Sequence, residues 1–387
     1  MRIIGGGIAG TAAALALHKA GFHVTVHEAH PDTGEDIGAF LTLASNGMRA
    51  LAEIDAAEAV AALGFPITTM TVLDASGAEL AAVPLGEPGH RLTRYRCLRR
   101  AELAAALRAE ARRRGIEVRH GARLTSVTET DADITAHFAD GTSATGDLLV
   151  GADGTHSAVR AWLDPAAPAA EYAGQRVFYG YSTAAAPSSG PERITMVRGS
   201  GAAFGYLVSP GGETCWFARV PGPAASPVEV AGTTPAQWRE WLAPLLGADR
   251  TPAAGIVART GDRLMVTNAL HVAPGARWRT RRAVLIGDAA HAASPATGQG
   301  ASMALEDAVV LAKALRDTPG AAAALARFEH HRRPRTEQNT AASARLTAGP
   351  PSAAPQARPD GARPRVDEDL LRLLAWDVPL PEPSGAV

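Results

Sequence analysis

The sequence predicts an α/β fold in which a Rossmann-like nucleotide-binding domain carries an inserted mixed β-sheet domain and ends in C-terminal helices. Three observations support this prediction. A glycine-rich turn joins a short apolar strand to an alanine-rich helix at the start of the chain, two later apolar runs end in glycine and aspartate, and aromatic residues are concentrated in the middle. Strands that alternate with helices favour a parallel sheet, whereas a run of consecutive strands favours a separate sheet domain.

The individual elements follow from hydrophobic periodicity and from the residues that begin and end helices. The first helix ends where Gly21 follows its last apolar residues, and the second strand alternates Val24 and Val26 with polar residues. An Asp140-Gly141 pair predicts a hairpin turn. The predicted strands span residues 3–4, 23–27, 123–129, 134–138, 148–150 and 284–286. The predicted helices span residues 11–20, 46–63, 100–114 and 300–315.

These elements divide the chain of 387 residues into four segments. Residues 1–174 are expected to form the first part of the nucleotide-binding domain, and residues 269–345 its second part. The inserted sheet domain between them spans residues 175–268 and would bind the substrate. Residues 346–387 are a tail rich in proline and alanine, in which residues 370–376 predict a short helix.

Composition and charge argue against several classes of function. The formal net charge is −1, so neither nucleic acid nor an anionic membrane would attract the chain over distance. Cys97 and Cys215 are far apart in the sequence, which predicts no disulfide framework and no metal site and suits a reducing cytoplasm. No apolar stretch predicts a membrane span or a signal peptide. The oligomeric state is left open.

The glycine-rich turn has the spacing of a dinucleotide-binding loop. It reads Gly5-Gly6-Gly7-Ile8-Ala9-Gly10. Gly5 permits the tight turn, Gly7 lets the backbone approach a pyrophosphate, and Gly10 lets the helix pack on the strand. The helix N-terminus at Ile8 and Ala9 supplies N–H groups and a positive dipole end. Glu28 ends the second strand, where a carboxylate would accept hydrogen bonds from a ribose diol. The alternative is a glycine turn that merely joins strand to helix.

Two later strand ends carry an aspartate. The first reads Gly151-Ala152-Asp153-Gly154 and precedes Arg160 on a predicted helix. Such a strand end is more often an ordinary turn than a functional site. The second reads Gly287-Asp288, where the carboxylate can bind a polyol hydroxyl.

A glycine-containing loop follows the Gly287-Asp288 pair. It contains Pro295, Gly298, Gln299 and Gly300, and its N–H groups could face a polar ring edge or a phosphate. The alternative for Pro295 and Gly298 is a loop without a binding role. For His291 we favour a buried, hydrogen-bonded histidine over a catalytic one.

Together these three blocks, over roughly residues 1–340, resemble the FAD-dependent monooxygenases, or aromatic-ring hydroxylases, of the para-hydroxybenzoate hydroxylase fold. The resemblance implies that the Gly5–Gly10 turn and Glu28 hold the ADP half of FAD, and that Asp288 binds the ribitol. It further implies that the loop from Pro295 to Gly300 lies beside the isoalloxazine. Three more residues are assigned to the cofactors through the resemblance: Arg100 in an Arg-x-x-Leu element, and Asp153 and Arg160, which would serve FAD and the nicotinamide donor.

The resemblance also implies an activity. NADPH or NADH would reduce FAD, and one oxygen atom from O2 would be inserted into an aromatic or alkene substrate by hydroxylation or epoxidation, in secondary metabolism. The alternative within the fold is an FAD-dependent reductase, dehydrogenase or halogenase, and the alternative outside catalysis is an FAD-binding regulator. Phe40, Tyr181, Tyr206 and Trp216 are the candidates for the substrate pocket, although an ordinary sheet core explains each of them as well. No residue stands out as a catalytic base.

Overall fold

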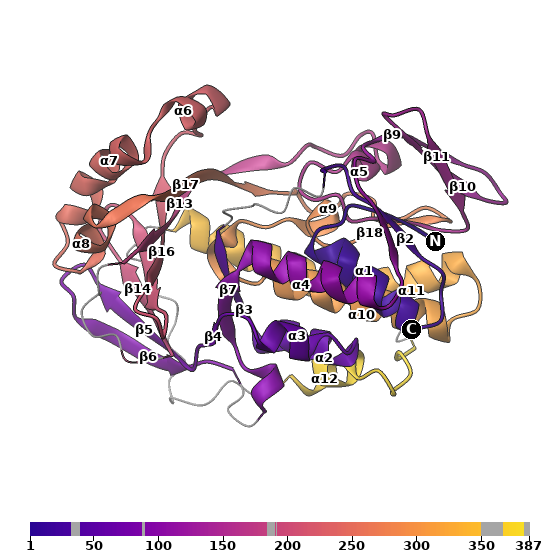
Figure 1. Cartoon of the computed structure of the whole chain (residues 1–387), viewed down its shortest axis with the longest axis horizontal. Coiled ribbons are helices and arrows are strands. Elements are labelled where there is room, and N and C mark those ends of the chain that lie inside the picture. Colours follow the sequence, from indigo (N-terminus) through magenta and orange to yellow (C-terminus); the bar gives the residue numbers. More distant parts are fainter. Residues whose placement is uncertain (32–38, 87–89, 184–189, 191, 350–366, 383–387) are drawn as a thin grey trace.

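The computed structural model describes residues 1–31, 39–86, 90–183, 190, 192–349 and 367–382. A parallel sheet lies at one end of the molecule and a larger mixed sheet at the other, and the long C-terminal helices run along both (Figure 1). This arrangement agrees with the predicted α/β class. None of the helices in the described residues is long and apolar enough to cross a bilayer.

The parallel sheet has five short strands in the order β18-β12-β1-β2-β8. Their bounds are β1 Arg2–Ile4, β2 Thr25–His27, β8 Glu117–Arg119, β12 Leu149–Gly151 and β18 Ala283–Leu285. Ile4 pairs with Gly151 on one side and with His27 on the other, and Gly151 pairs with Leu285. The carboxyl ends of four strands therefore reach the same edge of the sheet at the same level.

Helices on the parallel sheet enclose the main core. The helices are α1 Ile8–Lys19, α4 Arg100–Arg113, α5 Ala158–Leu163, α9 Asp288–His291, α10 Gly300–Asp317 and α11 Ala321–Ala348. Helix α1 packs between α10 and α4, and its buried face is built mainly of alanine, which allows close approach. The predicted hairpin is present as β9 Leu124–Glu129 and β10 Ile134–Phe138, extended by β11 Ser143–Gly146.

One predicted helix is interrupted. Instead of a single helix over residues 46–63, the chain forms α2 Ser45–Glu53 and α3 Ala57–Ala61. Asp55 lies between them with a φ of +57°, in the left-handed region that no α-helix can continue through. Lys19 stabilises this break, because its ammonium binds the Asp55 carboxylate at 2.9 Å and the Glu53 carbonyl at 2.8 Å.

The second sheet has seven strands in the order β17-β13-β16-β15-β14-β5-β6. Their bounds are β5 Thr69–Asp74, β6 Glu79–Pro84, β13 Glu171–Ser182, β14 Arg193–Arg198, β15 Ala203–Val208, β16 Thr214–Pro221 and β17 Thr260–His271. All neighbours are antiparallel except β14 and β5. The sheet is therefore wider than the segment 175–268, because β5 and β6 come from an earlier part of the chain.

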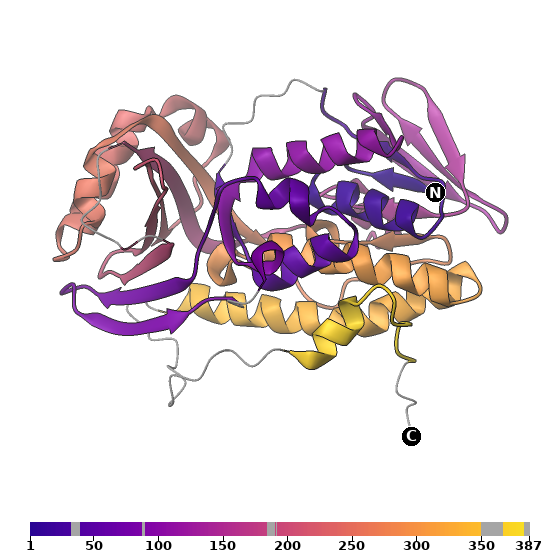
Figure 2. The ribbon, with the colours of Figure 1, turned by 60° about the horizontal axis from the view of Figure 1, so that its bottom comes forward.

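The two faces of this sheet have different coverings (Figure 2). One face of the sheet is covered by helices α6 Pro227–Gly232, α7 Pro235–Gly247 and α8 Ala253–Ala258. Side chains of this face and of α7 and α8 form a second hydrophobic core. We call that face the outer face. The inner face turns toward the nucleotide-binding part, where a small sheet joins the two halves. The small sheet consists of β3 Phe40–Leu43, β4 Phe65–Pro66 and β7 Arg96–Arg99, and the short helix η1 Arg91–Thr93 precedes β7.

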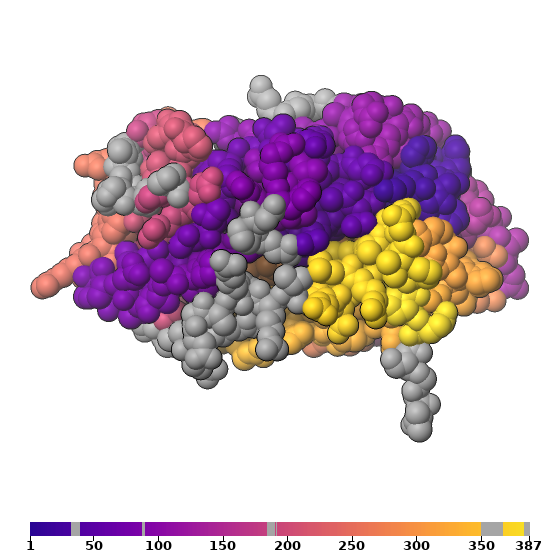
Figure 3. All heavy atoms as spheres, turned by 90° about the horizontal axis from the view of Figure 1, so that it is seen from below, coloured from indigo at the N-terminus to yellow at the C-terminus, as the bar shows by residue number. Residues whose placement is uncertain are grey.

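The C-terminal tail returns to the body of the molecule. Its helix α12 Glu368–Leu374 lies where a short helix is predicted and buries Leu370 and Leu374 against the main core. Lys313 of α10 donates to the carbonyls of Leu373 and Ala375 at 2.7 and 2.6 Å, which satisfies the free end of α12. Figure 3 shows this segment in yellow on the surface, between the N-terminal part and the C-terminal helices.

Candidate active site

The three glycine-and-aspartate motifs leave the parallel sheet side by side. Backbone hydrogen bonds hold the strand ends in register: Gly5 donates to His27, Ala152 donates to Ile4, and Ile286 donates to Gly151. Segments that are more than 100 residues apart in the sequence therefore form one continuous edge. Ligands of open α/β sheets bind at such carboxyl edges.

The first turn is shaped so that only glycine fits at two of its positions. Gly5 has a φ of +102°, and a Cβ there would lie 2.4 Å from the Ala152 carbonyl oxygen. A Cβ on Gly10 would lie 1.9 Å from the Gly5 oxygen. Beside Gly7, in contrast, a Cβ would meet nothing within 4 Å, and no side chain caps the start of α1. Open space above uncapped N–H groups of a helix fits a pyrophosphate.

Glu28 lies against this turn, as its position after β2 predicts. One carboxylate oxygen accepts from the Gly6 N–H at 2.6 Å, and the other accepts from the His30 N–H at 2.8 Å. A carboxylate has about four lone-pair positions, so each oxygen can accept one further hydrogen bond. The side chain therefore both fixes the turn and retains the capacity to bind a diol.

Asp153 and Arg160 are used inside the protein. The Asp153 carboxylate accepts from the Ser157 hydroxyl at 2.5 Å and from the N–H groups of Ala158 and Val159 at 2.8 and 3.1 Å, which satisfies the start of α5. Arg160 is only 4% exposed and donates to the carbonyls of Ala289 and Thr155 at 2.9 and 2.6 Å. The buried Arg160 thus connects α5 to α9. The role toward FAD and the nicotinamide donor that the resemblance implies for Asp153 and Arg160 stays a prediction.

The Gly287-Asp288 strand end has the opposite character. Gly287 has a φ of +58°, and a Cβ there would lie 2.8 Å from the Ala9 Cβ, so this turn packs directly on the start of α1. Asp288 is half-buried, and within the described part of the chain its carboxylate has no hydrogen-bond partner. A carboxylate without a partner at this edge fits a polyol such as ribitol.

The loop after α9 extends the same edge. Pro295–Thr297 form a short 3-10 helix, η2, and Gly298 follows in the left-handed conformation with a φ of +65°. A Cβ on Gly298 would lie 3.3 Å from the Thr42 hydroxyl of β3, so the loop lies close to the small sheet. Gln299 accepts from the Asn46 amide at 3.1 Å, and α10 begins at Gly300 without a side-chain cap.

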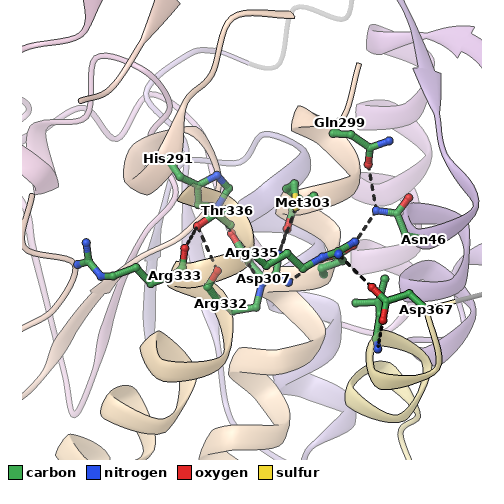
Figure 4. A network of polar contacts seen from close by, with 12 residues as sticks. Asn46, His291, Gln299, Met303, Asp307, Arg332, Arg333, Arg335, Thr336 and Asp367 are labelled. Atoms are coloured by element: carbon green, nitrogen blue, oxygen red, sulfur yellow. Dashed lines mark hydrogen bonds and ion pairs between the residues drawn. The ribbon is translucent and has the colours of Figure 1, made fainter. Parts of the chain in front are cut away.

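A buried network of ion pairs and hydrogen bonds connects this edge to helices α2, α10 and α11 (Figure 4). One oxygen of Asp307 lies 2.9 Å from the Gly287 N–H that it accepts from and 2.5 Å from Nε2 of His291, and the other accepts from Nε of Arg332 at 2.7 Å. Nη1 of Arg332 donates to Glu306 at 2.6 Å, and Glu306 also accepts from Asn46 at 2.6 Å. The network therefore joins the aspartate turn, the following loop and α2.

The electrostatics of the network favour the charged forms. Burial alone would raise the pKa of Asp307, but the charges of His291 and Arg332 and their hydrogen bonds bring it down to about 2. The same carboxylates hold the pKa of Arg332 above its ordinary value despite complete burial. His291 is 8% exposed and hydrogen-bonded to Asp307, which agrees with the expected non-catalytic histidine.

Arg99 and Arg100 point to different places. Arg99 binds Glu213 of the sheet domain at 3.2 Å, and its guanidinium lies 5.2 Å from the centre of the Tyr181 ring. Arg100 is exposed at the start of α4. Burial raises the pKa of Tyr179, and the charge of Arg100 offsets part of this rise. The choice of Arg100 over Arg99 as the arginine nearer the cofactor is compatible with this geometry and remains a proposal.

The predicted pocket residues divide between the two faces of the mixed sheet. Phe40 and Tyr181 belong to the core on the inner face, with ring centres 6.2 Å apart. Tyr206 and Trp216 lie on the outer face, and the Trp216 indole donates to the Thr260 hydroxyl at 2.8 Å. Their assignment to the pocket is therefore corrected: they pack the core against α7 and α8.

Side chains next to the predicted ones provide the inner face instead. Tyr179 and Phe217 contact Phe40, with ring centres 6.1 and 6.3 Å away. Cys97 and Cys215 are free thiols of the same core, and burial together with Cys215 raises the pKa of Cys97 well above its usual range. The two cysteines are thus neighbours in the fold although they are distant in the sequence.

Comparisons with known proteins extend over both halves of the site. A model of the FAD binding domain family matches residues 1–343. An FAD-dependent urate hydroxylase of Klebsiella pneumoniae is 31% identical over 332 residues, 85% of each chain. Aurachin C monooxygenase/isomerase of Stigmatella aurantiaca is 32% identical over 357 residues, which cover 89% of this chain and 88% of the relative. The crystal structure of Klebsiella pneumoniae HpxO with FAD and uric acid matches with a TM-score of 0.78 and 30% identity, over 90% of this chain and 88% of that one.

Asp288→Ala is expected to yield largely flavin-free protein. The ribitol would lose a charged acceptor, which corresponds to an affinity for FAD lower by about 10- to 100-fold. The FAD content of the purified variant, measured by absorbance, checks this. Asp262→Ala, at an exposed position of the sheet domain, is the control and should keep its flavin. Full FAD occupancy of the Asp288 variant would contradict the role of this carboxylate.

Glu28→Ala should weaken FAD binding by about 1.5–3 kcal/mol, the range for a hydrogen bond to a charged group. Glu28→Gln should lose less, because its amide oxygen can still accept from the Gly6 N–H. Titration of the flavin-free protein with FAD, followed by the quenching of flavin fluorescence, gives both dissociation constants. Unchanged affinity in the alanine variant would show that Glu28 does not face the cofactor.

Asp307→Asn should lower the free energy of unfolding by about 3–5 kcal/mol at pH 7, because it leaves the buried Arg332 short of one counter-charge. The pKa of Asp307 is depressed to about 2, so its contribution is complete above the unfolded pKa of about 3.9 and is lost as the pH falls through 2. The gap between variant and wild type in urea unfolding should therefore narrow in acid.

The matched control for this experiment is Asp131→Asn, which removes an exposed carboxylate from its ion pair with Arg281. It should change stability by less than about 1 kcal/mol. A gap for Asp307→Asn that stays constant from pH 7 to pH 2 would rule out the charge of Asp307 as the source of its effect.

Proposed function

Because the chain belongs to the FAD-binding-domain family and is an FAD-dependent monooxygenase, we propose that it inserts one oxygen atom from O2 into an aromatic or unsaturated small molecule, with NADPH or NADH as the reductant. The observation that carries the proposal is a single edge of the described structure, at which the uncapped start of α1, the Asp288 carboxylate without a partner and the uncapped start of α10 meet. Each of these groups lacks a partner that a flavin dinucleotide could supply.

Different residues at this edge would bind different parts of FAD. The turn from Gly5 to Gly10 would hold the pyrophosphate, Glu28 the adenosine ribose and Asp288 the ribitol. The loop from Pro295 to Gly300 would lie along the flavin ring, and its N–H groups would face the polar edge of the ring. When bound and reduced, FAD would supply the electrons that activate O2, and the transferred oxygen atom would come from O2.

The chain's own contribution is to position the substrate and to exclude water. Phe40 of β3 contacts Tyr179, Tyr181 and Phe217 of the mixed sheet, so aromatic rings would form the walls of a substrate site between the small sheet and the inner face. An apolar enclosure of this kind orients an aromatic ring and keeps water from the reacting atoms. The loop carrying Gly298 contacts Thr42 of the same small sheet, which brings the cofactor loop beside this enclosure.

The substrate class follows from this enclosure and from the relatives. One relative is named for urate and another for aurachin C, and the inner face of this chain carries aromatic side chains suited to a ring. We therefore expect an aromatic or alkene intermediate of secondary metabolism, converted by hydroxylation or epoxidation. We assign the dinucleotide-binding fingerprint at Gly5–Gly10 to FAD and not to the reductant.

The experiment that tests this function uses the FAD-loaded protein with NADPH, a panel of phenols, indoles and polycyclic aromatics, and ¹⁸O2. A substrate should accelerate NADPH oxidation and yield a product that carries one ¹⁸O atom, detected by mass spectrometry. NADPH consumption that gives only hydrogen peroxide with every ligand would support an oxidase, and reduced or halogenated products without ¹⁸O would support a reductase or a halogenase. Each of these outcomes would contradict oxygen insertion.

A further inference from the structure

A buried arginine lies on the inner face of the mixed sheet without a partner. Arg219 of β16 is 9% exposed, and its Nε and Nη1 atoms are both buried without a hydrogen bond to any residue that the structure describes. An arginine keeps its charge in proteins, because its pKa lies far above neutral pH. Burial lowers the pKa of Arg219, but the ordinary pKa of an arginine is so high that the side chain stays charged at neutral pH.

The strand register places this guanidinium beside the proposed substrate space. Arg219 pairs with Val177 of β13 and Ala203 of β15, and it shares its face of β16 with Phe217, two residues away. Burial raises the pKa of Tyr179, and the charges of Arg100 and Arg219 offset part of this rise. Arg219 therefore lies near the same ring that Phe40 contacts from the other side of the space.

Several other buried arginines among the described residues are satisfied. Arg332 has two carboxylates, and Arg176, on the outer side of the same sheet, binds Glu229 at 2.7 Å. Arg96 donates to the carbonyls of Ala61 and Leu63 at 2.7 and 2.9 Å. A buried cation without a counter-charge or an acceptor is costly, so its presence in a binding region indicates that a ligand supplies the missing group.

We propose that Arg219 binds an anionic oxygen group of the substrate, such as a ring carboxylate, and so makes the site specific for an aromatic acid. This inference rests on the proposed function, because it assumes that the inner face binds the ring that is oxidised. Arg219 is then a specificity-determining residue: it holds the acid group at the sheet and thereby fixes which part of the ring faces the cofactor loop. Charge-assisted hydrogen bonds from a guanidinium that is shielded from water would orient the substrate ring in this way.

The test measures ligand binding by the change in the flavin absorption spectrum of the FAD-loaded protein. The probes are matched acids and amides: benzoate and benzamide, anthranilate and anthranilamide, and 1-naphthoate and 1-naphthamide. The wild type should bind the acid of at least one pair more tightly than its amide by about 10- to 100-fold. Arg219→Met should abolish this preference, and Arg219→Lys should retain part of it.

Arg198→Met is the matched control. Arg198 has the same exposure as Arg219 and lies in the same cross-strand row, on the far side of Ala203. It also lacks a hydrogen-bond partner among the described residues, but its guanidinium nitrogens reach solvent, whereas Nε and Nη1 of Arg219 are buried. The control should keep the preference for acids. A wild type that binds no acid, binds the amides equally well, or keeps its preference in the Arg219→Met variant would overturn the proposal, as would loss of the preference in the control alone.

Thermal unfolding separates a binding role from a structural one. Without ligand, Arg219→Met should raise the midpoint of unfolding by about 2–4 °C, because it removes an uncompensated buried charge. A structural role requires the opposite sign, so a lowered midpoint would overturn the proposal. The flavin content and the activity of each sample distinguish failure of the proposed function from failure of the role of Arg219. A flavin-loaded protein that inserts oxygen but shows no preference for acids refutes only the role of Arg219.

Discussion

The common register of four parallel strands is the constraint on which the rest of this structure depends. Because β18, β12, β1 and β2 end at one level, turns that are far apart in the sequence meet at one edge and can share one ligand. The turns then pack against each other: Gly10 against Gly5, Gly5 against Ala152, and Gly287 against Ala9. A side chain at any of these glycines would separate the turns, so the glycines serve the assembly of the edge as much as the approach of a ligand.

Polar groups at this edge fall into two classes with different roles. The first class has hydrogen-bond partners within the protein and fixes the turns in place; it consists of Asp153, Arg160, Asp307 and Arg332. Asp288 and the N–H groups at the starts of α1 and α10 lack side-chain partners among the described residues, and these are the groups that we propose to bind the cofactor. The satisfied groups hold the unsatisfied ones in position, which is how a site is preorganised before its ligand arrives.

Much of this site could be predicted from the sequence, because its turns are local. The spacing of Gly5, Gly7, Gly10 and Glu28 is set by the geometry of one strand-turn-helix unit, and the structure places these residues together. The pocket side of the mixed sheet could not be predicted in the same way. Strands β15 and β16 are apolar on both faces, so no alternation indicates which face packs against helices. The sequence therefore does not show that Tyr206 and Trp216 face the helices and not the pocket. Arg219 and Arg332 cannot be singled out from the sequence, because a chain rich in arginine gives no local sign of which arginines are buried.

The most direct test of the central claim is a crystal structure of the protein with FAD. This account predicts the pyrophosphate over the Gly5–Gly10 turn, the ribitol at Asp288, and the flavin ring between the Pro295–Gly300 loop and the inner face of the mixed sheet. A protein that crystallises in this fold yet binds no FAD, or binds it away from the carboxyl edge of the parallel sheet, would contradict it.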